Sequence, residues 1–300
     1  MKRFSVIGVG CVGANLIHSL VQKGYQLKGV APPPVWVRAR TGRTNEGPGK
    51  HITAPLDKKA RIFNALLQSL AAHPGLENSA SYIKEDIASM VEASDFVFIT
   101  TQESRIKEAA GLIAKQAAPA GKIFFHTSNS LTAAELREIK EQGGLTASFS
   151  PLQTFADFDP GIDLFAGIYF LTEGDAPALA LGREIAAALG AKALVVDAAE
   201  KPLLHMAAVS SSNFLISVLK FAEGRIKRCR GDFDIGIMLP LIEQTLKNVE
   251  KKGVDASLTG PLQRGEAGIL RKHLALLEGE DAAFYKTLSE YLNPTAWGSV

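Results

Sequence analysis

A glycine-rich turn near the amino end constrains the fold of this 300-residue chain more than any other feature. The run Val6-Ile7-Gly8-Val9-Gly10-Cys11-Val12-Gly13 follows a short apolar segment and opens a helical pattern. Glycine at these spacings allows a tight turn after a strand, close approach of the backbone to a pyrophosphate, and close packing of the following helix. The first amides of that helix would then face the phosphates of a dinucleotide. The predicted cofactor contacts in this turn are Gly8, Gly10, Cys11, Val12 and Gly13.

Strand and helix patterns alternate through the first two thirds of the chain, which is typical of a parallel sheet with helices on both faces. Together with the glycine turn, this alternation predicts an α/β fold, the Rossmann doubly wound parallel sheet. The predicted strands are Phe4–Gly8, Leu27–Val30, Phe96–Thr100, Lys122–His126, Thr146–Phe149, Gly167–Leu171 and Ala193–Val196. The predicted helices between them are Ala14–Lys23, Lys58–Ala72, Asp86–Glu92, Arg105–Ala117, Ala133–Gln142 and Ala176–Leu189.

After Asp197 the strand patterns stop, and four helical patterns follow: Lys201–Arg228, Ile235–Lys252, Glu266–Leu277 and Ala282–Leu292. Because 300 residues is long for a single hydrophobic core, we expect two domains. Residues 1–199 are predicted to form the dinucleotide-binding Rossmann domain. Residues 200–300 are predicted to form a smaller, all-helical domain that binds substrate and pairs two copies into a homodimer.

The end of the second predicted strand should determine which cofactor binds. NAD enzymes usually carry Asp or Glu there to bond the ribose 2′-hydroxyl, but this chain has Lys28-Gly29-Val30-Ala31. Arg38, Arg40 and Arg43 follow in a proline-rich segment, and guanidinium groups suit a 2′-phosphate. NADP is therefore the predicted cofactor, with NAD as the alternative. The other interpretation of these arginines is that they only solvate a loop.

Polar residues follow two further predicted strands. Thr101 and Gln102 follow one of them and Ser128 follows another. Because ligands of such sheets bind at the carboxyl ends of the strands, these three residues are predicted to contact the cofactor or substrate. The alternative is that they only end strands and cap helices.

The long helical pattern Lys201–Arg228 carries the predicted catalytic residues Lys201, His205 and Asn213. Reduction of a carbonyl needs a proton donor near the developing alkoxide, which a lysine or histidine can supply while an amide orients the substrate. On an α-helix His205 and Asn213 would lie about 80° apart, close enough to share a cleft. The alternative for a lone histidine on an apolar helix is a core residue without a catalytic role.

A turn rich in Gly and Pro, Leu258–Glu266, presents Thr259 and Arg264 beside a helix start. Arg264 could hold a substrate carboxylate through two parallel hydrogen bonds. Thr259 and Arg264 are therefore predicted to bind substrate. The alternative for Arg264 is a salt bridge between helices.

Composition argues against several other classes of protein. The net charge of only +2 gives no field that would draw the chain to nucleic acid or to an anionic membrane. Cys11 and Cys229 are far apart and no HExxH motif is present, so we expect neither a disulfide framework nor a metal site. No apolar run reaches the length that we expect of a membrane span. The protein is predicted to be cytoplasmic.

Four segments resemble those of the Rossmann-like oxidoreductases that carry a C-terminal domain of unknown function: His126-Thr127-Ser128, Ser150–Phe155, His205–Val209 with Asn213, and Leu258-Thr259-Gly260-Pro261 with Arg264-Gly265. That family is similar in architecture to pyrroline-5-carboxylate reductase and ketopantoate reductase. Some of its members are regarded as an alternative type of ketopantoate reductase. The resemblance runs nearly end to end and implies His205, Asn213, Thr259 and Arg264 as site residues. Ser150 stands where relatives usually have His, and Asn129 where they usually have Gly.

Three functions follow as hypotheses. The leading one is an NADP-dependent oxidoreductase that transfers hydride to a small 2-keto acid, with ketopantoate as the first candidate. The second is an imine reductase that resembles pyrroline-5-carboxylate reductase. The third is a regulatory protein that binds NADP without turnover, for which the departures at Ser150 and Asn129 are the support.

Overall fold

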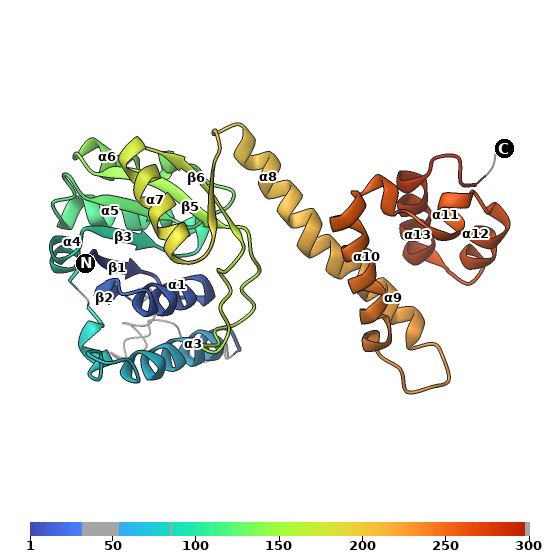
Figure 1. Cartoon of the computed structure of the whole chain (residues 1–300), viewed down its shortest axis with the longest axis horizontal. Helices are drawn as coiled ribbons and strands as arrows, with labels where there is room; N and C mark the ends of the chain where they lie inside the picture. The colour runs from blue at the N-terminus through green and yellow to red at the C-terminus, as the bar shows by residue number, and fades with distance from the viewer. Residues whose placement is uncertain (32–53, 85, 298–300) are drawn as a thin grey trace, which may run out of the picture. The chain divides into compact units, whose positions relative to one another are not determined.

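The computed structural model describes residues 1–31, 54–84 and 86–297. Its first part is one seven-stranded sheet in the order β2-β1-β3-β4-β5-β6-β7, with helices packed on both faces (Figure 1). This arrangement confirms the predicted Rossmann fold, and each predicted strand is present. The strands are β1 (Arg3–Ile7), β2 (Gln26–Ala31), β3 (Phe96–Ile99), β4 (Ile123–His126), β5 (Leu145–Pro151), β6 (Tyr169–Gly174) and β7 (Lys192–Val195).

The expectation of a fully parallel sheet is wrong at one position. Strand β6 pairs antiparallel with β5, with Ala147 opposite Gly174 and Pro151 opposite Phe170, whereas β7 pairs parallel with β6. A parallel neighbour requires a crossover, usually through a helix. Residues 152–168, which connect β5 to β6, contain no helix, so the chain returns directly and reverses its direction.

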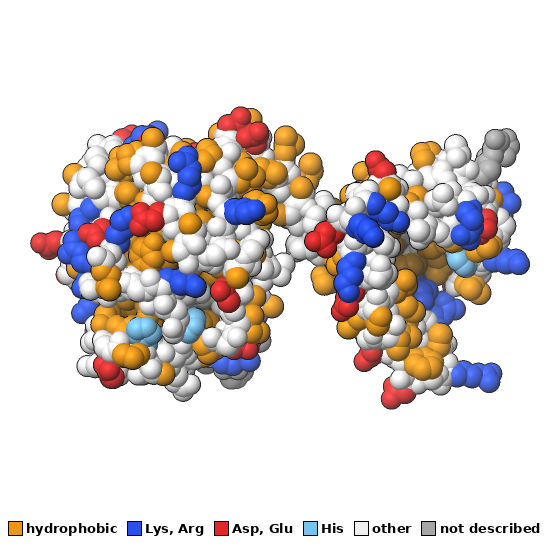
Figure 2. All heavy atoms as spheres, viewed as in Figure 1, with side chains coloured by type: hydrophobic (Ala, Val, Ile, Leu, Met, Phe, Trp, Pro, Cys, Tyr) orange, Lys and Arg blue, Asp and Glu red, His pale blue; other side chains and the backbone are white. Residues whose placement is uncertain are grey.

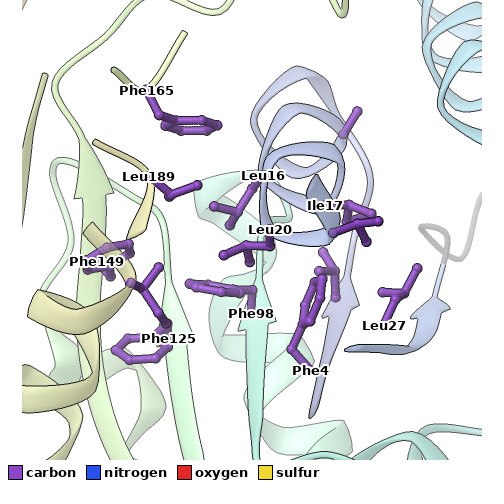
Figure 3. Close-up of a cluster of buried hydrophobic side chains, with 14 of the residues drawn as sticks. Phe4, Leu16, Ile17, Leu20, Leu27, Phe98, Phe125, Phe149, Phe165 and Leu189 are labelled. Carbon is purple, nitrogen blue, oxygen red and sulfur yellow. The ribbon is translucent and has the colours of Figure 1, made fainter. Parts of the chain in front are cut away.

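Two apolar clusters cover the two faces of the sheet. One cluster joins the sheet to helices α1, α3 and α7 and contains a row of phenylalanines that includes Phe98, Phe125 and Phe149 (Figure 3). The ring centroids of Phe98 and Phe125 are 5.1 Å apart, and those of Phe125 and Phe149 are 5.5 Å apart. The other cluster joins the sheet to α4, α5 and α6. These helices are α1 (Cys11–Gln22), α3 (Ala54–Ala71), α4 (Ile87–Ala93), α5 (Ile106–Gln116), α6 (Arg137–Glu141) and α7 (Ala176–Ala188).

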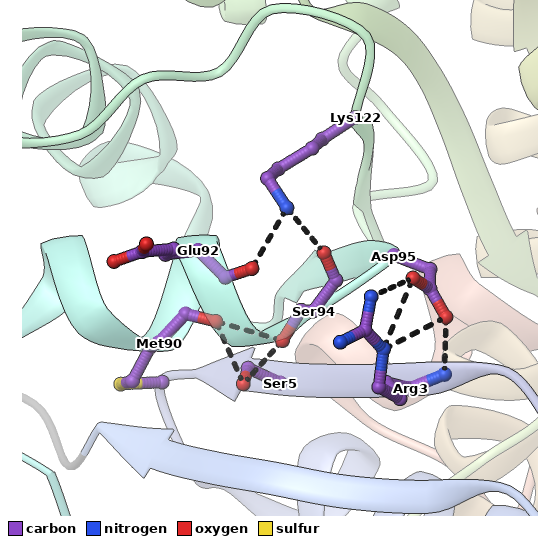
Figure 4. Close-up of polar contacts among 7 residues, drawn as sticks. All are labelled: Arg3, Ser5, Met90, Glu92, Ser94, Asp95 and Lys122. Carbon is purple, nitrogen blue, oxygen red and sulfur yellow. Dashed lines mark hydrogen bonds and ion pairs between the residues drawn. The ribbon is translucent and has the colours of Figure 1, made fainter.

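Polar side chains are paired at the amino ends of β1, β3 and β4 (Figure 4). The carboxylate of Asp95 accepts hydrogen bonds from the backbone N–H of Arg3 at 2.8 Å and from its guanidinium at 2.6 Å. The buried hydroxyls of Ser5 and Ser94 lie 2.8 Å apart, and Ser94 donates to a carbonyl of α4. The ammonium of Lys122 donates to the carbonyl oxygens of Ser94 and of a residue in α4. This edge of the sheet is held by contacts internal to the fold.

Between β7 and residue 297, the regular elements are all helical, as predicted. Contacts divide the chain into two compact units, Met1–Val209 and Ser210–Val300, so helix α8 belongs with the sheet. The predicted boundary at residue 199 would assign α8 to the helical part instead. The elements are α8 (Glu200–Val209), a π-helical turn (Ser210–Phe214), α9 (Leu215–Ile226), α10 (Leu239–Lys252), α11 (Gly260–Arg264), α12 (Ala267–Leu274) and α13 (Gly279–Leu292).

One helical stretch, Glu200–Ile226, is long and apolar enough to cross a membrane by length and composition. The most apolar window within it has a mean hydropathy of 1.4, and none of that window is buried. This finding corrects the expectation that no apolar run reaches that length. A single helix of this kind is weak evidence for a membrane span.

Candidate functional site

Two glycines of the predicted cofactor turn are required by the fold itself. Gly8 has a φ of +88°, and a Cβ there would lie 2.6 Å from Cγ2 of Thr101. A Cβ on Gly13 would lie 2.4 Å from Oγ1 of Thr100 and 2.9 Å from the carbonyl oxygen of Gly8. The hydroxyl of Thr100 donates to that same carbonyl. Glycine at these two positions therefore lets α1 and the end of β3 pack against the turn.

Gly10 differs from both, because the fold does not require a glycine there. Its φ of −113° is one that any residue adopts, and no described atom beyond its chain neighbours lies within 4 Å of a Cβ built on it. Gly10 is also the N-cap of α1 and provides no side chain to cap the first amides, which have no acceptor within the helix. Open space beside free amides fits a phosphate group that must approach the backbone closely.

The start of α1 is fixed by the loop that follows β5. The side-chain amide of Asn15 donates to the carbonyl oxygen of Cys11 at 2.8 Å and to that of Asp157 at 3.1 Å. Sγ of Cys11 lies 3.8 Å from the carbonyl oxygen of Ala156. Cys11 and Val12 are both partly exposed, so the predicted cofactor contacts at these positions are accessible.

Three buried polar atoms near the carboxyl ends of β3 and β4 and on α8 have no hydrogen-bond partner among the residues that the structure describes. They are Oγ1 of Thr101, Oδ1 of Asn129 and Nδ1 of His205. Native folds leave few buried polar atoms unpaired, and such atoms gather where a ligand or water is expected. Gln102, next to Thr101, is exposed. The carboxyl ends of the strands thus carry unsatisfied polar groups where the sequence predicts the ligand.

Ser128 ties the loop after β4 to the loop after β3. Its hydroxyl donates to a carboxylate oxygen of Glu103 and accepts the backbone N–H groups of Ser130 at 3.2 Å and Leu131 at 3.0 Å. Burial raises the pKa of Glu103, but hydrogen bonds from Ser128 and Ser130 and the charge of His205 outweigh it, so the net pKa is lowered. Glu103 is therefore ionised at neutral pH.

The start of α8 is set by a reciprocal capping box. Oδ1 of Asp197 accepts the N–H groups of Ala199 and Glu200, each at 2.7 Å, and the Glu200 carboxylate accepts the N–H of Asp197 at 2.8 Å. This pairing satisfies the first amides of the helix. It also fixes the backbone from which Lys201 extends.

The side chain of Lys201 is fully buried, which is rare for a lysine. Its ammonium donates to the carbonyl oxygen of Leu131, in the loop fixed by Ser128. Burial lowers the pKa of Lys201 to about 8, while the charges of Glu173 and Glu103 act in the opposite direction. A buried amine with a pKa close to neutrality suits proton transfer.

His126, at the end of β4, is a neutral structural histidine. Its Nδ1 accepts the N–H of Ser128 at 3.2 Å, so Nε2 carries the proton and donates to the carbonyl oxygen of Thr132 at 2.9 Å. Burial, with the nearby Lys201 charge, lowers the pKa of His126 to about 4. His126 thus supports the loop and is not available for proton transfer near neutral pH.

The other predicted site residues belong to the second unit or lie outside the described residues. Asn213 lies in the π-helical turn, where the α-helical spacing used to relate it to His205 does not hold. Thr259 is the N-cap of α11. Arg264 forms a two-point ion pair with Glu266, at 2.7 and 3.0 Å. Arg38, Arg40 and Arg43 lie outside the described residues.

Sequence reasoning missed Glu103 and Glu173. The carboxylate of Glu173, on β6, accepts the N–H of Ala133 at 2.9 Å and interacts with the Lys201 charge. Glu103 could have been found because it follows Thr101 and Gln102 at the end of a predicted strand. Glu173 gave no comparable signal, since it lies within the antiparallel strand.

Comparisons with known proteins agree with this fold. The model of a family described as a domain of unknown function, DUF2520, matches residues 168–292. No curated protein sequence matches the chain.

Solved structures also resemble the chain over nearly its whole length, among them the following three. A protein from Bacteroides fragilis described as an NADP oxidoreductase is 22% identical over 98% of each chain, with a TM-score of 0.71. A reductive aminase from Aspergillus terreus, solved with NADPH and ethyl-5-oxohexanoate, is 16% identical over 97% of this chain and 93% of its own, with a TM-score of 0.61. An imine reductase from Streptomyces aurantiacus is 15% identical over 98% and 94%, with a TM-score of 0.58. At these identities the likeness establishes the Rossmann sheet followed by a helical region, which agrees with the predicted fold class.

Proposed function

We propose that this chain is an NADP-dependent oxidoreductase that reduces a small carbonyl or imine compound. The observation that carries the proposal is the presence, in one unit, of an open glycine turn, a buried lysine, and the buried atoms of Thr101, Asn129 and His205 that have no partner among the described residues. The solved structures described as oxidoreductases and reductases support it.

The glycine turn would hold the pyrophosphate of the cofactor, through the amides at the start of α1 and the open space at Gly10. When bound, the cofactor supplies the hydride. Thr101 and Ser128 would be its neighbours on the loops after β3 and β4, and Arg38 and Arg40 would recognise the 2′-phosphate. NAD is the alternative cofactor.

The first candidate substrate is a small 2-keto acid such as ketopantoate. A carbonyl oxygen needs a proton as it becomes an alcohol, and the buried Lys201 ammonium and His205 are the candidate donors. Asn213, Thr259 and Arg264, which belong to the second unit, are proposed from the sequence alone, Asn213 to orient the substrate and the other two to bind its carboxylate. Arg264 would first have to release Glu266, so Arg264→Ala should raise KM far more than it lowers kcat.

The second candidate substrate is an imine, and one observation favours it. Glu103 is an ionised carboxylate beside the predicted site. It would repel the carboxylate of a keto acid and attract a protonated imine. An imine that arrives protonated also needs no strong acid.

The test is NADPH oxidation by the purified chain against ketopantoate, other 2-keto acids, pyrroline-5-carboxylate and simple cyclic imines. Turnover of one compound class supports the proposal and fixes the chemistry. His205→Ala and Lys201→Met, measured side by side, then separate the two candidates. A carbonyl reductase should lose on the order of a hundredfold in kcat in the variant that lacks its proton donor, whereas an imine reductase should keep most activity in both variants. Saturable NADPH binding without turnover of any compound would favour the regulatory alternative.

We also propose that the second unit pairs two copies into a homodimer in the cytoplasm. Apolar side chains gather on its surface around α9 and α10 (Figure 2). Only four of its described residues are buried: Ile226, Leu270, Ser289 and Ala296. Its exposed apolar residues include Ile216, Val218, Leu239, Leu241, Leu246 and Leu292.

Apolar exposure on this scale is typical of a protein–protein interface. Dimer formation would also explain the apolar helical stretch Glu200–Ile226 without a membrane. Leu239 and Leu246 lie seven residues apart on one face of α10. Leu239→Lys with Leu246→Lys should give a monomer in sedimentation velocity, while Gln244→Lys on the same helix should not. A wild-type chain that sediments as a monomer would contradict this part of the proposal.

A further inference from the structure

The ammonium of Lys201 lies where three elements of the first unit meet. It donates to the carbonyl oxygen of Leu131 in the loop after β4. The carboxylate of Glu173 interacts with its charge from β6, and that of Glu103 from the loop after β3. Glu103 cannot turn away freely, because Ser128 holds its carboxylate. The hydroxyl of Ser128 also accepts a hydrogen bond from the N–H of Leu131, and the carbonyl oxygen of Leu131 accepts a hydrogen bond from the Lys201 ammonium.

We propose that Glu103 is a positioning residue whose carboxylate, fixed by Ser128 and Ser130, keeps the buried Lys201 ammonium charged and bound to the loop after β4. The chain of contacts runs from Glu103 through Ser128 to Leu131 and then to Lys201. It links the loops at the carboxyl ends of two strands to the first turn of α8. Glu103 thus acts on the proton donor without being a donor itself.

Among the described residues, the carboxylates that act on the Lys201 charge as counterions are those of Glu173 and Glu103. His126 faces it from β4 but is neutral, with a pKa lowered by burial to about 4. On its own helix, the carboxylates of Asp197 and Glu200 bind backbone amides of the capping box. His205 lies one turn further along α8 and interacts with Glu103. Burial of an amine favours its neutral form, so removal of either counterion should make Lys201 lose its proton at lower pH.

The direct test measures the protonation of Lys201 in the protein without cofactor. NMR of chain labelled with ¹³C at the lysine Cε position follows each ammonium with pH, and Lys201→Met identifies the signal. The wild-type signal should titrate near pH 8. In Glu103→Gln its midpoint should move to lower pH by on the order of one unit. Glu103→Asp, which keeps the charge, should return the midpoint most of the way to the wild-type value.

Two control variants separate this role from a general loss of charge or structure. Glu108→Gln removes an exposed carboxylate, five residues after Glu103, that pairs with Arg105. This variant should leave the Lys201 midpoint unchanged. Ser128→Ala keeps the charge of Glu103 but releases it, and should give a smaller shift in the same direction. A Glu103→Gln midpoint equal to that of the wild type, in a variant with native circular dichroism, would overturn the proposal.

A kinetic arm rests on the proposed function and fails separately from the NMR arm. With a carbonyl substrate found in the panel above, kcat/KM should fall as pH rises through about 8, because the protonated donor is lost. The fall should move to lower pH in Glu103→Gln by the shift that NMR measures. An NMR shift in a chain that reduces no compound would sustain the role of Glu103 and count against the reductase. Turnover of a compound, with no shift in Glu103→Gln by NMR or by kinetics, would support the reductase and overturn the role of Glu103.

Discussion

The two edges of the same sheet differ in how they satisfy their polar groups. At the amino ends of the strands, the guanidinium of Arg3 donates to the carboxylate of Asp95, and the ammonium of Lys122 donates to a backbone carbonyl oxygen (Figure 4). At the carboxyl ends, Thr101 and Asn129 each leave a buried atom unpaired within the described part of the chain. Both edges belong to the same strands, so the arrangement of the strands does not explain why polar atoms are paired at one edge and unpaired at the other.

This difference distinguishes polar residues that stabilise the fold from polar residues that are available to bind a ligand. A fold that pairs its polar groups fully at one edge has the means to pair them at the other. The unpaired atoms of Thr101 and Asn129 at the carboxyl edge therefore point to a partner other than the residues that the structure describes. The glycine turn shows the same distinction on a smaller scale, since Gly8 and Gly13 are required by packing and Gly10 is not.

The largest effect is expected from replacing Lys201 on α8, compared with replacing Lys122 at the amino ends of the strands. With a carbonyl substrate, Lys201→Met should lower kcat by on the order of a hundredfold or more, because it removes a buried proton donor. Lys122→Met removes two hydrogen bonds to carbonyl oxygens and should cost on the order of 1 kcal/mol of stability without changing kcat. Steady-state kinetics and urea unfolding of both variants measure the two effects. Equal kcat in Lys201→Met and the wild type would remove Lys201 from the reaction.

A smaller effect is expected for Gly10→Ala. The added methyl group has open space in the protein alone, so the free energy of unfolding should change by no more than about 0.5 kcal/mol. The methyl would occupy the approach to the phosphates, so NADPH affinity should fall by roughly tenfold, about 1.4 kcal/mol. Gly13→Ala is the matched variant and should lose stability as well. If Gly10→Ala binds NADPH as the wild type does, the turn does not hold the pyrophosphate as proposed.

The smallest effect is expected at the amino edge with Asp95→Asn. The hydrogen bond from the Arg3 side chain, chiefly, lowers the pKa of Asp95, and the pair is partly exposed. Its contribution of about 1 kcal/mol or less is therefore present above the unfolded-state pKa near 3.9 and lost as pH falls through the lower folded value. Urea unfolding should show the wild type more stable at pH 7, and the two proteins should converge as pH falls through the lowered folded-state pKa of Asp95. NADPH affinity should not change, and a change would show that the two edges are coupled.

Local patterns in the sequence predicted most of the first unit. The seven strands, the glycine turn and the start of the helical region all follow from periodicity and turn residues that lie within a few positions of one another. The direction of β6 was not predicted, because a strand pattern reads the same in either direction. Only the lack of a helix between β5 and β6 indicated it.

The site was predictable only in part, because its decisive contacts join residues far apart in the chain. Ser128 and Lys201 were identified from their places after a strand and at a helix start. Their partners Glu103 and Leu131 could not be, since each contact depends on how the loops meet in space. The π-helical turn at Asn213 was also beyond reach, because the pattern of apolar residues there fits an α-helix.

The measurement that tests the central claim most directly is a calorimetric titration of the purified wild-type chain with NADPH and, separately, with NADH. The account predicts saturable binding of NADPH at one site per chain, with NADH binding more weakly. Tighter binding of NADH would contradict the preference for NADP. Binding of neither nucleotide would contradict the assignment of the carboxyl edge as a cofactor site and, with it, the proposed oxidoreductase.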